Sequence, residues 1–229
     1  MKPNKLKRFL VVVSIIIALI VLYTEAVNLN TPNMTFRQKL LKAFYPALMW
    51  SSKKAGTNAV ILTNSDVKPV IPFYSLSTVL NNGKTLNFES FKGKKVLLVN
   101  TASDCGYTNQ YESLQKLSEQ YKEKLRLIGF PANDFKEQEK GSDAQIAAFC
   151  KENFGVTFPL AAKSTVIKGF TQNTVFSWLS DAAKNGWNNK APSWNFSKYL
   201  VDEQGVLINY FDPSISPLSE EVIKAIAEN

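Results

Sequence analysis

A buried strand, a tight turn and a long helical pattern follow one another between residues 95 and 124. Four consecutive apolar residues at 96–99 predict the strand, and apolar residues at helical spacing from 111 to 125 predict the helix. A second apolar run at 125–130 predicts another strand, which ends at Pro131. Two apolar strands joined by a helix form a βαβ unit, so this stretch commits the chain to a sheet with parallel pairing.

The remaining patterns add strands and helices to this unit. The residues at 81–84 lie between two short apolar runs and predict a hairpin turn. Ser142 and Gly155 have the residue types that begin and end a helix. Two further helices are predicted at 170–179 and 220–227. A late hairpin of two strands is predicted at 199–201 and 206–208. This order predicts an α/β fold, a central mixed sheet with helices on both faces, and no internal repeat is visible.

Cys105 lies in the turn before the first predicted helix and is the first candidate for chemistry. Unpaired N–H donors and the positive end of a helix dipole favour a thiolate at such a position. Thr108 stands where a thioredoxin-type Cys-x-x-Cys site has its second sulfur, so Cys105 cannot relay two electrons within its own turn. A thiolate there can attack a peroxide and become a sulfenic acid, and Cys150 is the only other thiol of the chain that could condense with it.

The chain contains no histidine, which removes several mechanisms at once. A Ser-His-Asp triad, a Cys-His protease and the usual histidine-containing zinc sites are excluded, and we expect neither a metal nor a cofactor. A working cysteine must then be activated by a helix N-terminus, by nearby donors and by controlled access of solvent.

The formal charge of +8 is confined to the N-terminal part of the chain. Residues 1–70 contain ten Lys and Arg but only two acidic residues, Glu25 and Asp66, whereas residues 71–229 contain 17 of each sign. A nucleic acid is therefore not expected as a partner, because the larger part of the chain has no basic excess.

Residues 1–26 have the layout of a signal-anchor or a signal peptide, because a basic start precedes an almost entirely apolar run at 9–23. This run is short for a membrane span of roughly 20 residues and long for a signal core, and we favour an uncleaved anchor over a cleaved signal. The basic residues keep the first end in the cytoplasm. The rest of the chain is thus expected on the extracytoplasmic side, membrane-anchored, or secreted if the segment is cleaved.

Residues 27–70 are expected to form an amphipathic helix and a linker. Phe36, Leu40, Phe44 and Leu48 recur every four residues with basic residues between them, up to the disturbance at Pro46. Such a helix can lie on an anionic membrane surface or pack on the main domain, and the sequence favours neither. The polar stretch at 51–70 is typical of a linker.

Three separated blocks of the expected main domain, residues 71–229, carry a resemblance to a known family. The first is VNTASDCGYT at 99–108, the second is FPANDFKEQEKGS at 130–142, and the third is WNF at 194–196. They resemble the glutathione peroxidases in their cysteine form, and the resemblance extends over about residues 73–228. It implies a thioredoxin-like fold and a thiol peroxidase that reduces hydrogen peroxide or organic hydroperoxides.

Matched position by position, the resemblance implies a catalytic tetrad of Cys105, Gln138, Trp194 and Asn195. Cys105 would attack the peroxide. The amides of Gln138 and Asn195 and the indole of Trp194 would donate hydrogen bonds to the thiolate or to a bound peroxide oxygen. Such neutral donors suit a chain without histidine.

Cys150 falls where thioredoxin-dependent members of the family carry their resolving cysteine. The resemblance therefore implies an internal disulfide with Cys105, re-reduced by a thioredoxin-like dithiol or by glutathione, with the dithiol favoured. If the two sulfurs start far apart, the helix around Cys150 must loosen, since a disulfide needs Cα atoms within about 7 Å. A buried thiol on a helix face, without a role in turnover, is the other interpretation of Cys150.

The chain departs from the family pattern at Ala132, Asp134 and Lys140, where Cys, Gln and Pro are usual. Asp134 and Asp104 would add negative charge near the sulfur, which would raise its pKa and slow the attack. The interval from 170 to 194 is as short as in monomeric members, so a monomer is expected. The remaining alternative is a membrane-tethered thiol-disulfide or binding module of the same fold, without peroxidase turnover.

Overall fold

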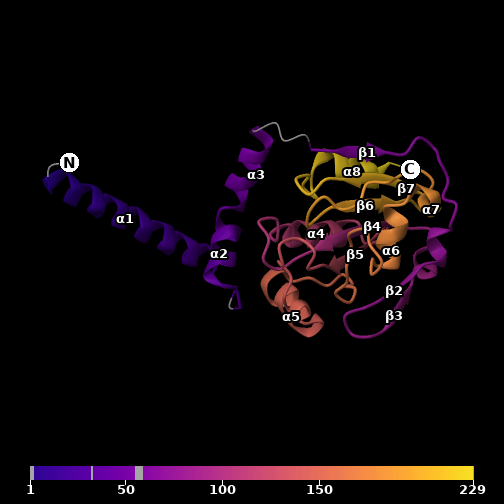
Figure 1. Cartoon of the computed structure of the whole chain (residues 1–229), viewed down its shortest axis with the longest axis horizontal. Coiled ribbons are helices and arrows are strands. Elements are labelled where there is room, and N and C mark those ends of the chain that lie inside the picture. The colour runs from indigo at the N-terminus through magenta and orange to yellow at the C-terminus, as the bar shows by residue number, and fades with distance from the viewer. Residues whose placement is uncertain (1–2, 32, 55–58, 229) are drawn as a thin grey trace.

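A five-stranded mixed sheet forms the centre of the protein (Figure 1). The computed structural model describes residues 3–31, 33–54 and 59–228. In spatial order the strands are β1 (Ile61–Thr63), β7 (Leu207–Phe211), β6 (Lys198–Val201), β4 (Lys95–Thr101) and β5 (Leu125–Pro131). β4 and β5 run parallel, with Lys95 opposite Leu125, and every other pairing in this sheet is antiparallel. The predicted βαβ unit and mixed sheet are confirmed.

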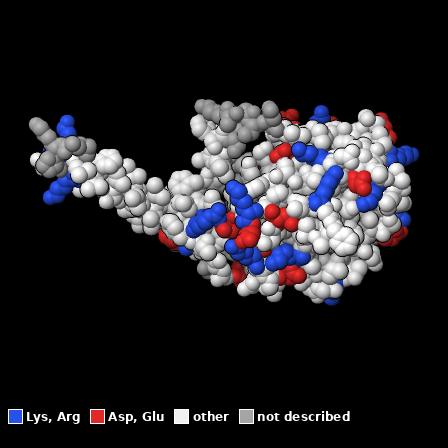
Figure 2. All heavy atoms as spheres, in the orientation of Figure 1, with Lys and Arg blue, Asp and Glu red and all other residues white. Residues whose placement is uncertain are grey.

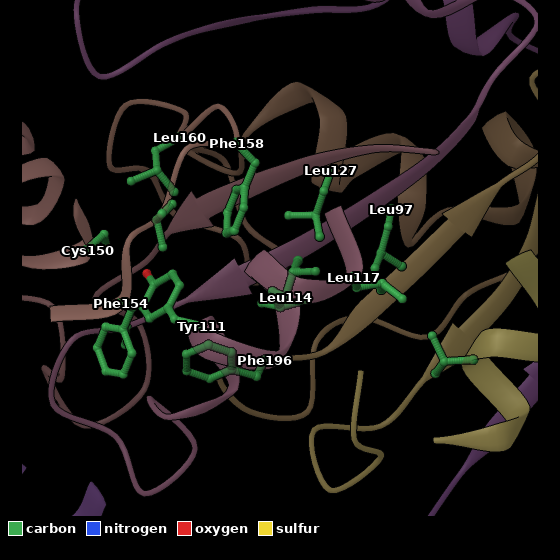
Figure 3. Close-up of a cluster of buried hydrophobic side chains, with 14 of the residues drawn as sticks. Leu97, Tyr111, Leu114, Leu117, Leu127, Cys150, Phe154, Phe158, Leu160 and Phe196 are labelled. Carbon is green, nitrogen blue, oxygen red and sulfur yellow. The ribbon is translucent and has the colours of Figure 1, made fainter. Parts of the chain in front are cut away.

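Helices cover both faces of the sheet, because the side chains of a strand alternate between its faces. On one face Leu97 and Val99 of β4 pack with residues of α4 (Gln110–Gln120), α5 (Asp143–Phe154) and α8 (Glu220–Ala227). On the other face Val96 and Leu98 pack with residues of α6 (Thr174–Leu179). Figure 3 shows the first of these clusters, in which Cys150 lies among aromatic and leucine side chains.

The local signals in the sequence account for most element boundaries. The predicted hairpin is formed by β2 (Ser77–Val79) and β3 (Thr85–Asn87). At α5 the Ser142 hydroxyl accepts from the Gln145 amide and the Gln145 side chain accepts from the Ser142 amide, which is a complete capping box. Gly155 ends α5 with a φ of +64°, in the left-handed region that glycine adopts without strain.

Some elements differ from the expectation. The helix expected at 170–179 begins only at Thr174, because the side chain of Asn173 caps it by accepting from the amide of Val175. The remaining short helical turns are η1 (Phe73–Ser75), η2 (Phe88–Phe91) and α7 (Ala182–Asn185). β1 lies within the stretch expected as linker, and its three residues pair with β7 at the edge of the sheet.

The N-terminal part consists of α1 (Pro3–Val27), α2 (Phe36–Ala43) and α3 (Tyr45–Lys54). α1 projects away from the sheet, and α2 and α3 lie between α1 and the domain that contains the sheet (Figure 1). From Asn4 to Val27, α1 is long and apolar enough to cross a membrane, a test that a signal sequence near an N-terminus also passes. Figure 2 shows that the length of α1 is uncharged and that Lys and Arg lie at its far end.

Candidate active site

Cys105 lies in the turn between β4 and α4, and hydrogen bonds hold the turn closed. The Cys105 amide donates to Oγ1 of Thr108 at 2.9 Å, and that hydroxyl donates to the carbonyl of Ala102 at 2.9 Å. The amide of Tyr107 donates to the Cys105 sulfur at 3.4 Å. Thr108 therefore supports the turn at the position where a dithiol carrier would need a second cysteine.

Two further donors reach the Cys105 sulfur from the loop before β6. The side chains of Trp194 and Asn195 interact with it, and both interactions lower its pKa and so favour the thiolate. Gln138 stands one step behind, because its side-chain oxygen accepts from Nδ2 of Asn195 at 3.0 Å. Its backbone carbonyl accepts from the Asp104 amide at 3.0 Å. The structure thus brings the four residues of the expected tetrad together, with Gln138 bonded to Asn195.

Asn100 on β4 positions the loop that carries Trp194 and Asn195. Its side chain donates to the Trp194 carbonyl at 3.1 Å and accepts from the Ser197 amide at 3.0 Å. Its backbone carbonyl accepts from the amide of Phe196, a residue with a φ of +70°. The sequence alone did not indicate a role for Asn100. The only signal was an amide within an apolar strand.

The electrostatics of Cys105 differ from the expectation of a thiolate at a helix start. The sulfur is only 1% exposed, and burial raises its pKa more than the hydrogen bonds from Tyr107, Trp194 and Asn195 lower it. The first residue of α4 is Gln110, so Cys105 precedes the helix by five positions. The dipole of α4 therefore does not dominate the pKa of Cys105, since the effect of a helix dipole falls off within one turn.

The two aspartates that were expected to raise the pKa of Cys105 both interact with other groups. The Asp104 carboxylate forms an ion pair with Arg37 of α2. The Asp134 carboxylate accepts from the Val166 amide at 2.7 Å. The charge that reaches Cys105 is that of Arg37, which lowers its pKa.

The helix α2 packs directly over the Cys105 turn, which is one of the two positions that the sequence allowed for it. Gln38 donates to the carbonyl of Ser103 at 2.9 Å, and Lys42 lies 5.1 Å from the ring centre of Phe154. A small enclosed cavity remains between α2 and the turn. Beside it an open groove of about 760 Å³ extends from α2 past Asp104 and Gln138 to α5.

Cys150 is fully buried on α5, and both cysteines are free thiols. Burial raises the pKa of Cys150 to about 12, and the adjacent Tyr111 side chain partly opposes this rise. In Figure 3 the hydroxyl end of Tyr111 points toward Cys150, between Phe154 and Leu160. Cys150 is thus a protonated thiol at neutral pH, packed in the core.

Glu139 is a second residue that the sequence did not indicate, and it places a buried carboxyl group next to the site. It is 1% exposed, and burial raises its pKa to about 7. Its carboxylate accepts from the Ser103 hydroxyl at 3.0 Å, and its amide donates to Oδ1 of Asn133 at 2.9 Å. Its negative charge raises the pKa of Cys150. The sequence does not indicate that Glu139 is buried, because it lies in a charged stretch whose other members Glu137 and Lys140 are exposed.

Comparisons with known proteins found a matching family and similar structures. A family model described as glutathione peroxidase matches residues 73–180. A glutathione peroxidase homolog BsaA of Staphylococcus epidermidis is 45% identical over 145 residues, which are 63% of this chain and 90% of that protein. A glutathione peroxidase of Lactococcus lactis subsp. cremoris is 40% identical over 157 residues, 67% of this chain and 99% of that protein. The protein in the crystal structure of T. cruzi GPX1 is 29% identical to this chain, with a TM-score of 0.51, over 68% of this chain and 94% of that one.

Proposed function

We propose that this chain, which belongs to the glutathione peroxidase family and is a thiol peroxidase, uses Cys105 as its peroxidatic thiol and Cys150 as its resolving thiol. The observation that supports this most directly is that three groups around the Cys105 sulfur lower its pKa. They are the amide of Tyr107 and the side chains of Trp194 and Asn195, from two segments far apart in the sequence. Fixed donors aimed at a sulfur stabilise the thiolate without a base.

In the first step the Cys105 thiolate attacks one oxygen of the peroxide. A sulfur–oxygen bond forms, the O–O bond breaks, and the second oxygen leaves as water or an alcohol after taking up a proton. The peroxide is reduced by two electrons and Cys105 is oxidised to a sulfenic acid. Trp194 and Asn195 hold the sulfur during this step, and Gln138 orients Asn195 through their hydrogen bond.

In the second step the Cys150 sulfur attacks the sulfenic sulfur. The disulfide bond forms, and the hydroxyl group leaves as water with the proton of the Cys150 thiol. Cys150 is fully buried in the core on α5, and in this proposal part of α5 loosens to bring it to Cys105. An external thioredoxin-like dithiol then restores both thiols by disulfide exchange, with glutathione as the second candidate reductant.

Oxidation by hydrogen peroxide tests these assignments. We expect the wild type to react much faster than a free thiol, Cys105→Ser to lose the reaction, and Cys150→Ser to retain it and accumulate a sulfenic acid. Mass spectrometry of the oxidised wild type should show a Cys105–Cys150 disulfide. A wild-type rate no faster than that of a free thiol would contradict the peroxidatic role, and a stable sulfenic or sulfinic acid in the wild type would contradict the resolving role.

We also propose that α1 anchors the chain in a membrane with the domain on the extracytoplasmic side. The length and apolar surface of α1 support this, together with the basic residues before it. The alternative of a module without turnover has no support in the site, because Thr108 is committed to the turn and the relatives are peroxidases in name.

A further inference from the structure

The helix α2 contributes a charge to the Cys105 turn from outside the part of the chain that matches the family. Arg37 lies 36 positions before the first residue that the family model matches. Its guanidinium donates to the Asp104 carboxylate and also, at 3.1 Å, to the Asp104 carbonyl. These two hydrogen bonds hold the guanidinium at Asp104, the residue that immediately precedes Cys105 in the sequence.

The position of Arg37 is itself held by neighbouring contacts. Thr35 and Gln38 form a complete capping box at the start of α2. Gln38 also donates to the carbonyl of Ser103. The contacts of Arg37 and Gln38 are thus made with consecutive residues of the turn, Asp104 and Ser103, so α2 is docked in one register.

An unpaired carboxylate at Asp104 would oppose ionisation of the neighbouring thiol. The buried sulfur already has a raised pKa, so any further opposing charge would reduce the thiolate further. With Arg37 present, the Asp104 carboxylate is paired, and Arg37 lowers the pKa of Cys105. The pair is about half exposed, which means that solvent and salt screen its influence.

We propose that Arg37 is a positioning residue of the active site, which neutralises Asp104 and so makes an acidic residue tolerable beside the peroxidatic cysteine. The proposal rests on the peroxidatic role of Cys105. It assigns to the N-terminal segment a part in the reaction, in addition to its proposed part in anchoring.

Other titratable groups surround the turn and are retained in every variant, and the Asp104 charge raises the pKa of one of them, Glu139. They are Tyr107 of the turn, Lys42 of α2, Tyr45 of α3, and Lys136 and Glu139 of the loop after β5. Glu139 titrates near neutral pH, so the comparison is made between variants that all retain it.

A charge cycle on the full chain tests the proposal. Arg37→Gln, Asp104→Asn and the double variant are made in the Cys150→Ser background, and the ultraviolet absorbance of the Cys105 thiolate is followed against pH. The same titration of the Cys105→Ser, Cys150→Ser protein is subtracted to remove the tyrosines. This readout follows the sulfur whether or not the protein turns over, so its failure is distinguishable from failure of the proposed function.

We expect the lowest midpoint of the Cys105 thiolate titration in Asp104→Asn and the highest in Arg37→Gln. The protein with both wild-type charges and the double variant should share an intermediate midpoint. At low salt the midpoint of Arg37→Gln should rise by about half a pH unit, which is about a threefold loss of thiolate, and the rate with peroxide should fall in parallel. Arg37→Lys should retain most of the effect. Arg126→Gln, which removes an arginine whose guanidinium donates to the backbone carbonyls of Lys122 and Leu125, is the matched control.

Three outcomes would overturn the proposal. The first is an unchanged midpoint in Arg37→Gln. The second is a double variant as impaired as Arg37→Gln, which would mean that Arg37 only holds α2 in place. The third is a faster reaction of Arg37→Gln with peroxide, which would make α2 an inhibitory cover.

Discussion

Trp194 combines two roles at the sulfur, because its indole is a hydrogen-bond donor and its ring is a packing surface. The ring lies 5.4 Å from that of Phe135, and Lys136 lies 5.7 Å from its centre. Trp194→Phe retains an aromatic ring there but removes the donor. We expect the rate of Cys105 oxidation to fall about ten- to a hundredfold, because a hydrogen bond to a charged group is lost. Peroxide consumption in single turnover measures this.

The control for Trp194→Phe is Trp187→Phe. The indole of Trp187 also donates a hydrogen bond, to the carbonyl of Leu207 at 2.7 Å, but not to the sulfur. Its loss should affect stability without a comparable change in the rate. Equal rates for the wild type and Trp194→Phe would remove the indole from the mechanism.

Glu139 makes the stability of the fold depend on pH. Burial raises its pKa from an ordinary 4.5 to about 7, so the folded state holds the proton more tightly than the unfolded state. The carboxyl group is therefore neutral and without penalty below about pH 4.5, and it increasingly destabilises the fold as pH rises to about 7. Glu139→Gln should raise the free energy of unfolding at pH 8 by about 2 kcal/mol, and by much less at pH 5.

Denaturant unfolding at both pH values measures this difference. Glu137→Gln is a matched control, because Glu137 is an exposed neighbour in the same loop. A gain for Glu139→Gln that is equal at pH 5 and pH 8 would contradict titration of a buried carboxyl group.

At the residue scale, the sequence predicted those site residues whose neighbours along the chain form recognisable blocks. Cys105, Trp194 and Asn195 meet as expected, although only the structure shows that Gln138 bonds to Asn195. The partner of Asp104 could not be predicted, because Arg37 is 67 residues away and reaches it only through the docking of α2.

At the scale of elements, α5 must combine a stable fold with release of Cys150. Its capping box at Ser142 contributes to its stability. Ser142→Ala removes one cap bond, at a cost of about 1 kcal/mol, so open forms of α5 become about fivefold more populated. If loosening of α5 limits resolution, disulfide formation after a peroxide pulse should accelerate by a similar factor. Quenched-flow alkylation followed by mass spectrometry measures it.

Asn173→Ala is the matched control for Ser142→Ala. Asn173 caps α6, a helix that carries no cysteine, by accepting from the amide of Val175. That variant should lose stability without faster disulfide formation. An unchanged or slower rate in Ser142→Ala would mean that opening of α5 is not the limiting step.

Element boundaries were predictable where caps and periodicity are local, as for the βαβ unit and for α5. They were not predictable where tertiary pairing decides. β1 has only three residues, and its strand conformation depends on hydrogen bonding to β7, more than 140 residues away. Three residues are too few for a periodic pattern.

At the scale of the whole molecule, α1 should decide where the protein is found. Deleting residues 1–20 removes most of the apolar shaft but retains the end of α1, where Glu25 pairs with Lys39 and Thr24 accepts from Asn28. We expect the full chain in the membrane fraction and the shortened chain in the soluble fraction of cells, with the same rate of Cys105 oxidation. The intact mass of the full-length product shows whether the first segment is retained.

Recovery of the full-length chain in the cytoplasmic fraction would contradict anchoring. A shortened chain that remains bound to membranes would instead assign the attachment to the α2 and α3 segment, which exposes Phe36, Phe44 and Trp50.

The contact between Arg37 and Asp104 also has a consequence for how such sequences vary over time. The two residues balance each other across 67 positions, so a change at one alters the constraint at the other. Among chains of this kind, an acid before the cysteine should occur together with a basic residue on a preceding helix, and chains that lack that helix should carry a neutral or basic residue there. Covariation between these two positions, rather than conservation of either, is the trace that the ion pair would leave.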